Sequence, residues 1–299
     1  MDTQWAIKDY LAAKRDLVET SLADYMLQAG EYLAEHIEAM RYSLFAGGKR
    51  VRPILCLAAA EAVGGRAENA MPAACALECI HTYSLIHDDL PAMDDDDFRR
   101  GKPTNHKVFG EAGAILAGDG LLTFAFELLS NPELGLASDS QRLRVINLIA
   151  RAAGSRGMVG GQALDIACEG KGIPFETLQF IHSHKTGALI TGAVQAGGVM
   201  GNADSEQFQA LTAYGEHIGL TFQIVDDLLN VEGSLEQLGK AAGSDAARQK
   251  ATYPALFGLE ATKEKARATV ESAIDCLGDF DHRAEPLREL ARYIVNRKK

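Results

Sequence analysis

Six aspartates and two arginines stand within one short segment, HTYSLIHDDLPAMDDDDFRRG, which begins at His81. The first pair, Asp88 and Asp89, ends an apolar pattern, and Arg99 and Arg100 follow the last aspartate after a single phenylalanine. Clustered carboxylates repel one another unless a cation offsets their charge, and Mg²⁺ suits this task because it prefers oxygen ligands. Mg²⁺ beside arginines indicates a phosphate ligand. The alternative is a solvated acidic loop, which stays open for the last three aspartates.

A second polar cluster follows helical spacing. Gln223, Asp226, Asp227 and Asn230 lie at i, i+3, i+4 and i+7, which places them on one face of a helix. Both flanks of this stripe are apolar, a pattern that is typical of a buried helix whose polar face lines a cavity. The alternative is an ordinary solvent-exposed face.

Basic residues form two sets, one near the first aspartate pair (Lys49, Arg52 and Arg100) and one later in the chain (Lys185, Lys240 and Lys250). Arginine binds phosphate oxygens in pairs, lysine acts as a point charge, and metal ions neutralise a leaving diphosphate. If the helices with the two aspartate pairs face each other, their carboxylates can hold several Mg²⁺ ions. A site that is ionic at its mouth and apolar below predicts a prenyl diphosphate ligand. No P-loop glycine pattern and no evident Ser-His-Asp arrangement compete with this interpretation.

Helices must position these residues. The 299 residues include only 8 prolines and show apolar positions every three to four residues, so we expect an all-α fold and one domain over residues 1–299. The first expected helix ends near residue 27. The others cover 31–45, 54–63, 70–90, 111–129, 139–167, 204–231 and most of 254–299. Asp119 is expected to be buried in the helix at 111–129. A loop at 232–252 has the length of a functional lid.

Composition limits the class of protein. The net charge of −11 argues against a nucleic-acid binder, and hydrophobic residues make up 47% of a chain without CxxC pairs. Cys75 and Cys79 lie one helical turn apart without further ligands nearby, so we expect them to pack in the core. The beginning of the chain, MDTQWAIKDYLAAKR, lacks the core of a signal peptide, and apolar runs fall short of the ~18 residues of a membrane span. We expect a soluble, cytoplasmic protein.

The ordered motifs resemble those of the trans-isoprenyl diphosphate synthases, and most closely the bacterial farnesyl diphosphate synthases. They are GGKRVRP from Gly47, HDDLPAMDDDDFRRG, GGQALD from Gly160, HKTGAL from His184, FQIVDDLLN and LGK ending at Lys240. The resemblance covers nearly the whole chain. It implies the all-α isoprenoid synthase fold, a helical bundle around a central cavity, and a homodimer.

The resemblance also implies roles for individual residues. Isopentenyl diphosphate would be held by Lys49, Arg52, His81 and Arg100. Mg²⁺, three ions per site with substrate bound, would be held by Asp88, Asp94 and Asp226. The allylic diphosphate would be held by Arg99, Lys185, Thr186, Gln223 and Lys240. We also count Asp89 among the catalytic candidates and Lys250 among the substrate-binding ones. His81 alone would more often be a core histidine, and only the motif reverses that interpretation.

The implied reaction ionises an allylic diphosphate, first dimethylallyl and then geranyl, and condenses the cation with isopentenyl diphosphate to give farnesyl diphosphate. Tyr83, five residues before the first aspartate, would form the floor of the pocket with Ser84 beside it. Asn230 departs from the family pattern, which usually has a third aspartate there. The alternatives are a geranyl or geranylgeranyl synthase, a terpene cyclase, and a non-catalytic subunit that modulates a true synthase.

Overall fold

The computed structural model describes residues 7–135, 137–232 and 252–296. Its helices are α1 (Ile7–Tyr25), α2 (Ala34–Leu44), α3 (Val51–Ala62), α4 (Ala67–Asp88), α5 (Asn105–Ser130), α6 (Asp139–Ala153), α7 (Met158–Cys168), α8 (Phe175–His182), α9 (Ala188–Met200), α10 (Ser205–Glu232), α13 (Tyr253–Phe257), α14 (Leu259–Asp275) and α15 (Glu285–Asn296). A π-helical turn, η1 (Ser183–Gly187), joins α8 to α9, and a 3-10 turn, η2 (His282–Ala284), precedes α15. The strands are β1 (Phe98–Arg99) and β2 (Lys102–Pro103), a two-residue hairpin. The expected all-α fold is confirmed.

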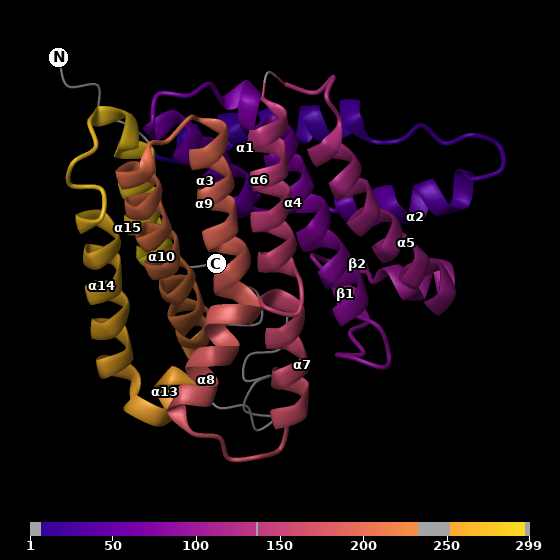
Figure 1. Ribbon diagram of the computed structural model, residues 1–299. Coiled ribbons are helices and arrows are strands. Elements are labelled where there is room, and N and C mark those ends of the chain that lie inside the picture. The colour runs from indigo at the N-terminus through magenta and orange to yellow at the C-terminus, as the bar shows by residue number, and fades with distance from the viewer. Residues whose placement is uncertain (1–6, 136, 233–251, 297–299) are drawn as a thin grey trace.

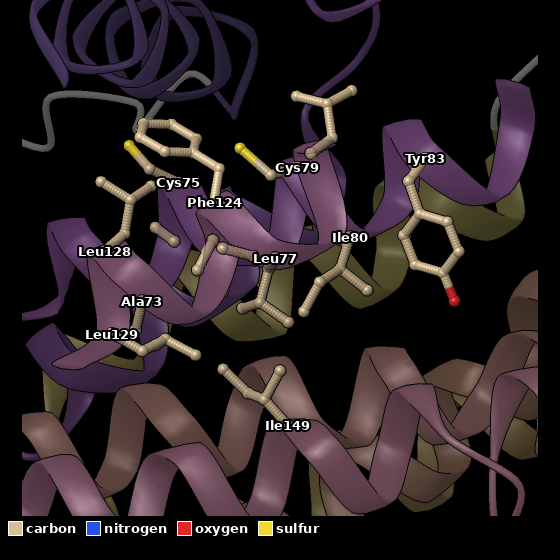
Figure 2. Packing of buried hydrophobic residues seen from close by; sticks show 14 of the residues in the cluster. Ala73, Cys75, Leu77, Cys79, Ile80, Tyr83, Phe124, Leu128, Leu129 and Ile149 are labelled. Carbon is tan, nitrogen blue, oxygen red and sulfur yellow. The ribbon is translucent and has the colours of Figure 1, made fainter. Parts of the chain in front are cut away.

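Helix α4 lies inside the bundle, packed against α3, α5 and α9 (Figure 1). Most of its 22 residues are buried, because the sequence AMPAACALECI offers small or apolar side chains on every face. Figure 2 shows Leu77 and Ile80 of α4 packed between Phe124 of α5 and Ile149 of α6. Cys75 and Cys79 are fully buried in this core and form no disulfide, as expected.

Helix α10 is the second long element of the site. It packs against α9, α14 and η1. Tyr214 and Ile218 on its apolar side are fully buried, and the Tyr214 hydroxyl donates to the Leu287 carbonyl at 2.6 Å, which joins α10 to α15. Both α4 and α10, the two helices that carry the aspartate pairs, pack against α9.

Glycines mark two interruptions of the helical chain. The expected helix at 139–167 is two helices, α6 and α7, and at Gly157 between them an added Cβ would lie 2.1 Å from the Ala152 carbonyl oxygen. Gly110, with a φ of 74°, kinks α5 immediately before residue 111, where we expected that helix to begin. The expectation for Asp119 was wrong: its side chain is 60% exposed, and its carboxylate lies 3.9 Å from the His87 ring at the end of α4.

Of the described helices, α5 is long and apolar enough to cross a membrane, whereas the sequence suggested no such run. The core helix of a soluble protein passes the same test, so this finding is weak evidence for a span.

Candidate active site

The chain folds back on itself directly after α4. Pro91 disfavours helical geometry at Leu90, and α4 ends at Asp88 with Asp89 as its C-cap. The backbone N–H of Asp94 then donates to the Asp88 carbonyl at 2.8 Å, which returns Asp94 to the helix end. Burial raises the pKa of the Asp88 carboxyl to about 6, with Lys185 opposing the shift and Asp94 adding to it. The charged form of Asp88 is therefore disfavoured by burial, and a bound cation would stabilise it.

Asp89 and Arg99 bind each other. The guanidinium donates to both carboxylate oxygens at 2.6–2.9 Å, and Asp89 is 3% exposed. This contact is set by the hairpin, whose turn residues Arg100 and Gly101 both have positive φ, as a type I′ turn requires. The last three aspartates of the loop differ in exposure. Asp96 is partly buried, and its carboxylate lies 3.7 Å from the Arg99 guanidinium, whereas Asp95 and Asp97 are exposed, as in the solvated-loop alternative.

A cavity of about 380 Å³, here called the basic pocket, brings together four predicted site residues: Lys49, Arg52, His81 and Arg100. Arg100 donates to the Gly47 carbonyl. Its guanidinium packs closely on Gly48, where an added Cβ would lie 2.9 Å from the guanidinium atoms. Burial, followed by the charges of Arg52 and Arg100, lowers the pKa of His81 well below its usual value. His81 is thus neutral among cations.

A second cavity, of about 390 Å³ and here called the central cavity, shares Arg52 and His81 with the basic pocket. Asp88, Lys185 and Thr186 also line it, and its remaining wall is mostly apolar. Tyr83 and Ser84 lie on this wall, and the Tyr83 ring packs edge-on against His87 at 5.7 Å between centroids. Figure 2 shows Tyr83 projecting from α4 one turn beyond Cys79 and Ile80.

Lys185 and Thr186 are carried by η1, which packs on α7. A Cβ on Gly161 would lie 2.3 Å from the Lys185 backbone nitrogen, so only glycine permits this contact. The Lys185 ammonium donates to the Asp165 carboxylate at 2.6 Å. A third cavity, of about 140 Å³, lies beyond Lys185 and Thr186 and is also lined by Gln223 and Asp227 of α10.

Two residues of α7 were missed as site residues although their motif was recognised. The Gln162 side-chain amide donates to the Asp88 carboxylate at 2.9 Å, and Asp165, one turn later, binds Lys185. The signal was the i, i+3 spacing of two polar residues in GGQALD, which places them on one face of a helix.

Helix α10 contributes its polar stripe as predicted. Gln223 and Asp227 line the third cavity, and Asp226 lies close enough to Arg52 to raise the arginine's pKa against the larger lowering effect of burial. Asp227 is 3% exposed and accepts a hydrogen bond from the Tyr253 backbone at 2.9 Å, so it also holds the start of α13. Lys240, Lys250 and the expected lid at 232–252, apart from its two ends, lie outside the described residues.

The donor set fits Mg²⁺, although the described part of the chain contains no preformed group of three metal-ligating side chains. Asp88 and Asp94 supply hard oxygen ligands close to each other, and burial, with the charge of Asp94 adding to it, raises the pKa of Asp88. Mg²⁺ retains several waters and needs only one or two carboxylates from the protein.

Comparison with known proteins decides the family. The polyprenyl synthetase family model matches residues 34–288. The chain belongs to this family. Farnesyl diphosphate synthase of Geobacillus stearothermophilus is 51% identical to it over 90% of the chain and 91% of the relative. A chloroplastic geranylgeranyl pyrophosphate synthase of Catharanthus roseus is 50% identical over 97% and 81%. The apo crystal structure of an FPP/GFPP synthase from Zymomonas mobilis superposes with a TM-score of 0.86 at 40% identity, over 97% and 98% of the two chains.

These findings confirm the expected resemblance and the all-α isoprenoid synthase fold. The chain is a prenyltransferase, and members of its family use divalent metal ions. Relatives that make products of different length are about equally similar to it, so identity alone does not assign the product.

Proposed function

We propose that this enzyme condenses isopentenyl diphosphate with dimethylallyl and then geranyl diphosphate, and releases farnesyl diphosphate. The observation that carries the proposal is the meeting of two cavities at Arg52 and His81: one is lined by cations, and the other is polar at Asp88 and Lys185 and apolar below. Two diphosphates with a hydrocarbon chain between them match this arrangement of charge.

The basic pocket would hold isopentenyl diphosphate. Lys49, Arg52 and Arg100 supply positive charge, and His81, held neutral, donates or accepts a hydrogen bond without adding to their repulsion. Because His81 and Arg52 also line the central cavity, the double bond of the bound substrate would reach into the cavity that holds the allylic chain.

The allylic diphosphate would lie at the other side of the central cavity. Lys185, Thr186 and Gln223 would bind its oxygens, and the Arg99–Asp89 pair would fix the loop that carries Asp94. These preorganised groups stabilise the negative charge that grows on the leaving diphosphate, which is commonly the largest catalytic term. The apolar wall excludes water from the allylic cation.

We propose Mg²⁺ as the metal, held by Asp88, Asp94 and Asp226, with three ions per site. When bound, Mg²⁺ neutralises the diphosphate as it leaves. Gln162 orients Asp88 by its hydrogen bond, and Asp165 orients Lys185 by its ion pair.

Tyr83 supports a fifteen-carbon product, because its buried ring lies on the wall of the central cavity one turn before Asp88. The second candidate is a geranylgeranyl synthase, favoured by the 50% identity to the Catharanthus relative. We further propose one catalytic domain over residues 1–299, a homodimer and a cytoplasmic location. Incubation of the pure chain with labelled isopentenyl diphosphate, an allylic diphosphate and Mg²⁺ tests the proposal; absence of any prenyl product would contradict it.

A further inference from the structure

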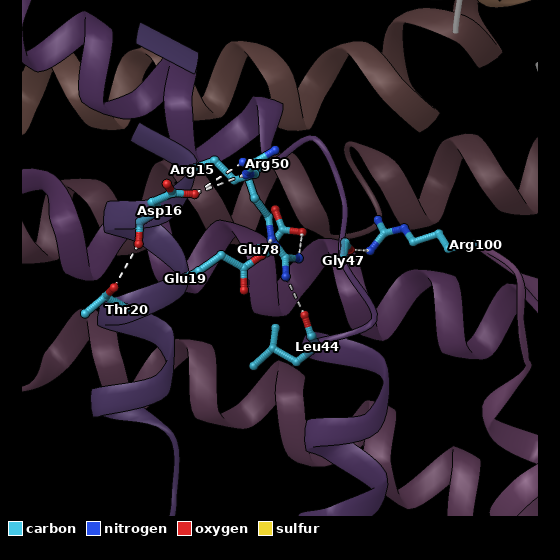
Figure 3. Close-up of polar contacts among 9 residues, drawn as sticks. All are labelled: Arg15, Asp16, Glu19, Thr20, Leu44, Gly47, Arg50, Glu78 and Arg100. Carbon is cyan, nitrogen blue, oxygen red and sulfur yellow. Dashed lines mark hydrogen bonds and ion pairs between the residues drawn. The ribbon is translucent and has the colours of Figure 1, made fainter. Parts of the chain in front are cut away.

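A buried ion pair, Arg50 with Glu78, lines the basic pocket beside the four residues named above and has none of the roles assigned so far. Arg50 has a fully buried side chain, and its guanidinium donates to Glu78 at 2.5 Å, to Glu19 at 2.7 Å and to the Leu44 carbonyl at 2.6 Å (Figure 3). Glu78 is 2% exposed. Three helices, α1, α2 and α4, are therefore tied to one side chain at the start of α3.

Arg50 also holds an unusual backbone. Its φ is 51°, and Gly47 and Gly48 before it have φ values of 87° and 145°. The left-handed conformation is unfavourable for a residue with a Cβ, so surrounding contacts must hold the backbone of Arg50 in it. The three contacts of the guanidinium do so here, and they set the path of the loop from residue 47 to residue 50.

The proposed isopentenyl-binding residues are distributed around this pair. Lys49 precedes Arg50 and Arg52 follows it by two residues, while His81 lies one turn after Glu78 on α4. Arg100 joins the same loop through the Gly47 carbonyl (Figure 3). The ion pair thus connects the loop half of the basic pocket to its helix half.

The charge of Glu78 acts on the same residues. It opposes the lowering of the pKa that burial imposes on Arg52 and on Arg100, and it raises the pKa of Arg50. Glu78 therefore offsets part of the repulsion among three arginines that must stay close together before any substrate arrives.

Folding stability alone is a poor explanation for such a pair. Burying two charges costs desolvation that their attraction often fails to exceed, and apolar residues of similar volume are frequently as stable. A role in fixing one geometry explains why charges are used at this place.

We propose that Arg50 and Glu78 are a positioning pair that sets the geometry of the isopentenyl diphosphate site, an inference that rests on the proposed function. Neither residue is a catalytic residue. They act through the positions of Lys49, Arg52, His81 and Arg100.

The test compares the KM for isopentenyl diphosphate with the KM for geranyl diphosphate. In Glu78→Gln we expect the first to rise on the order of tenfold, as small misplacements of binding groups commonly cause, and the second to stay within about twofold. The control is Glu61→Gln, which removes the partly buried ion pair of α3 with Lys14 of α1 away from the basic pocket. That variant is expected to lose stability and keep both KM values.

A second variant separates positioning from stability. Arg50→Met combined with Glu78→Leu removes both charges, and we expect its melting temperature to return towards the wild-type value while the KM for isopentenyl diphosphate stays high. Glu19→Gln, which removes only the partly exposed contact, is expected to give a smaller rise in the same KM.

Two results would overturn the inference: an unchanged KM for isopentenyl diphosphate in Glu78→Gln, or recovery of that KM in the double variant. If Glu78→Gln does not fold, the double variant and Glu19→Gln carry the comparison. Wild-type protein without any turnover would instead contradict the proposed function, so the two failures are distinguishable.

Discussion

Tyr83 belongs to the buried core of the protein and also lines the central cavity. Its ring is 7% exposed, contacts His87, and lines the central cavity one turn from Asp88. In Tyr83→Ala we expect longer products, because the chain can grow into the space that the ring leaves. Tyr83→Phe is the matched control and should keep the wild-type length. Chromatography of the products measures the effect, and the same length in both variants would refute the floor assignment.

His81 predicts a pH dependence of stability. Its pKa is lowered in the folded protein by burial and by neighbouring arginines, so below pH 6.5 the unfolded chain takes up a proton there and the folded protein does not. Stability therefore falls as the pH drops below 6.5, because protonation of this side chain favours the unfolded chain. His81→Gln should lose less stability than the wild type between pH 7.5 and 5.5. Parallel curves from denaturant titrations would contradict this expectation.

Asn230 offers a test of the second metal site. It lies half-buried one turn after Asp226, where an amide supplies an oxygen without charge. We expect Asn230→Asp to lower the Mg²⁺ concentration that gives half-maximal rate. An unchanged concentration would indicate that position 230 contributes little to metal binding.

At the scale of elements, the contact between α7 and η1 holds Lys185 in place. Gly161→Ala would force a Cβ against the Lys185 backbone, so we expect kcat to fall about tenfold or more and stability to decrease. Gly172→Ala is the control, because a Cβ there meets nothing within 4 Å. Equal kcat in the two variants would show that the close contact is not needed for catalysis.

The elements also show how far sequence patterns reach. The apolar spacing of α4 and the doubly apolar flanks of α10 predict buried helices, and both are observed, with the aspartates where expected. The break between α6 and α7 was missed because composition does not reveal a close approach of the backbone such as the one at Gly157, where an added Cβ would lie 2.1 Å from the Ala152 carbonyl oxygen. The Arg99–Asp89 pair was likewise hidden, since it depends on the hairpin turn that brings residue 99 back to the end of α4.

At the scale of the molecule, segments far apart in sequence form the cavities that meet at Arg52, His81 and Lys185. The motifs predict which residues bind phosphate, and the structure brings the four residues proposed for isopentenyl diphosphate together in one pocket. In the proposed function the product length would depend on the depth of the cavity below Tyr83, a property of packing between helices that a motif describes only through one residue.

The size of the product tests this account most directly. Pure protein would be incubated with Mg²⁺, labelled isopentenyl diphosphate and, separately, dimethylallyl, geranyl or farnesyl diphosphate, and the dephosphorylated products would be sized. We expect a fifteen-carbon product from the first two primers and no extension of farnesyl diphosphate. A twenty-carbon main product, or ready extension of farnesyl diphosphate, would contradict the proposed farnesyl diphosphate synthase.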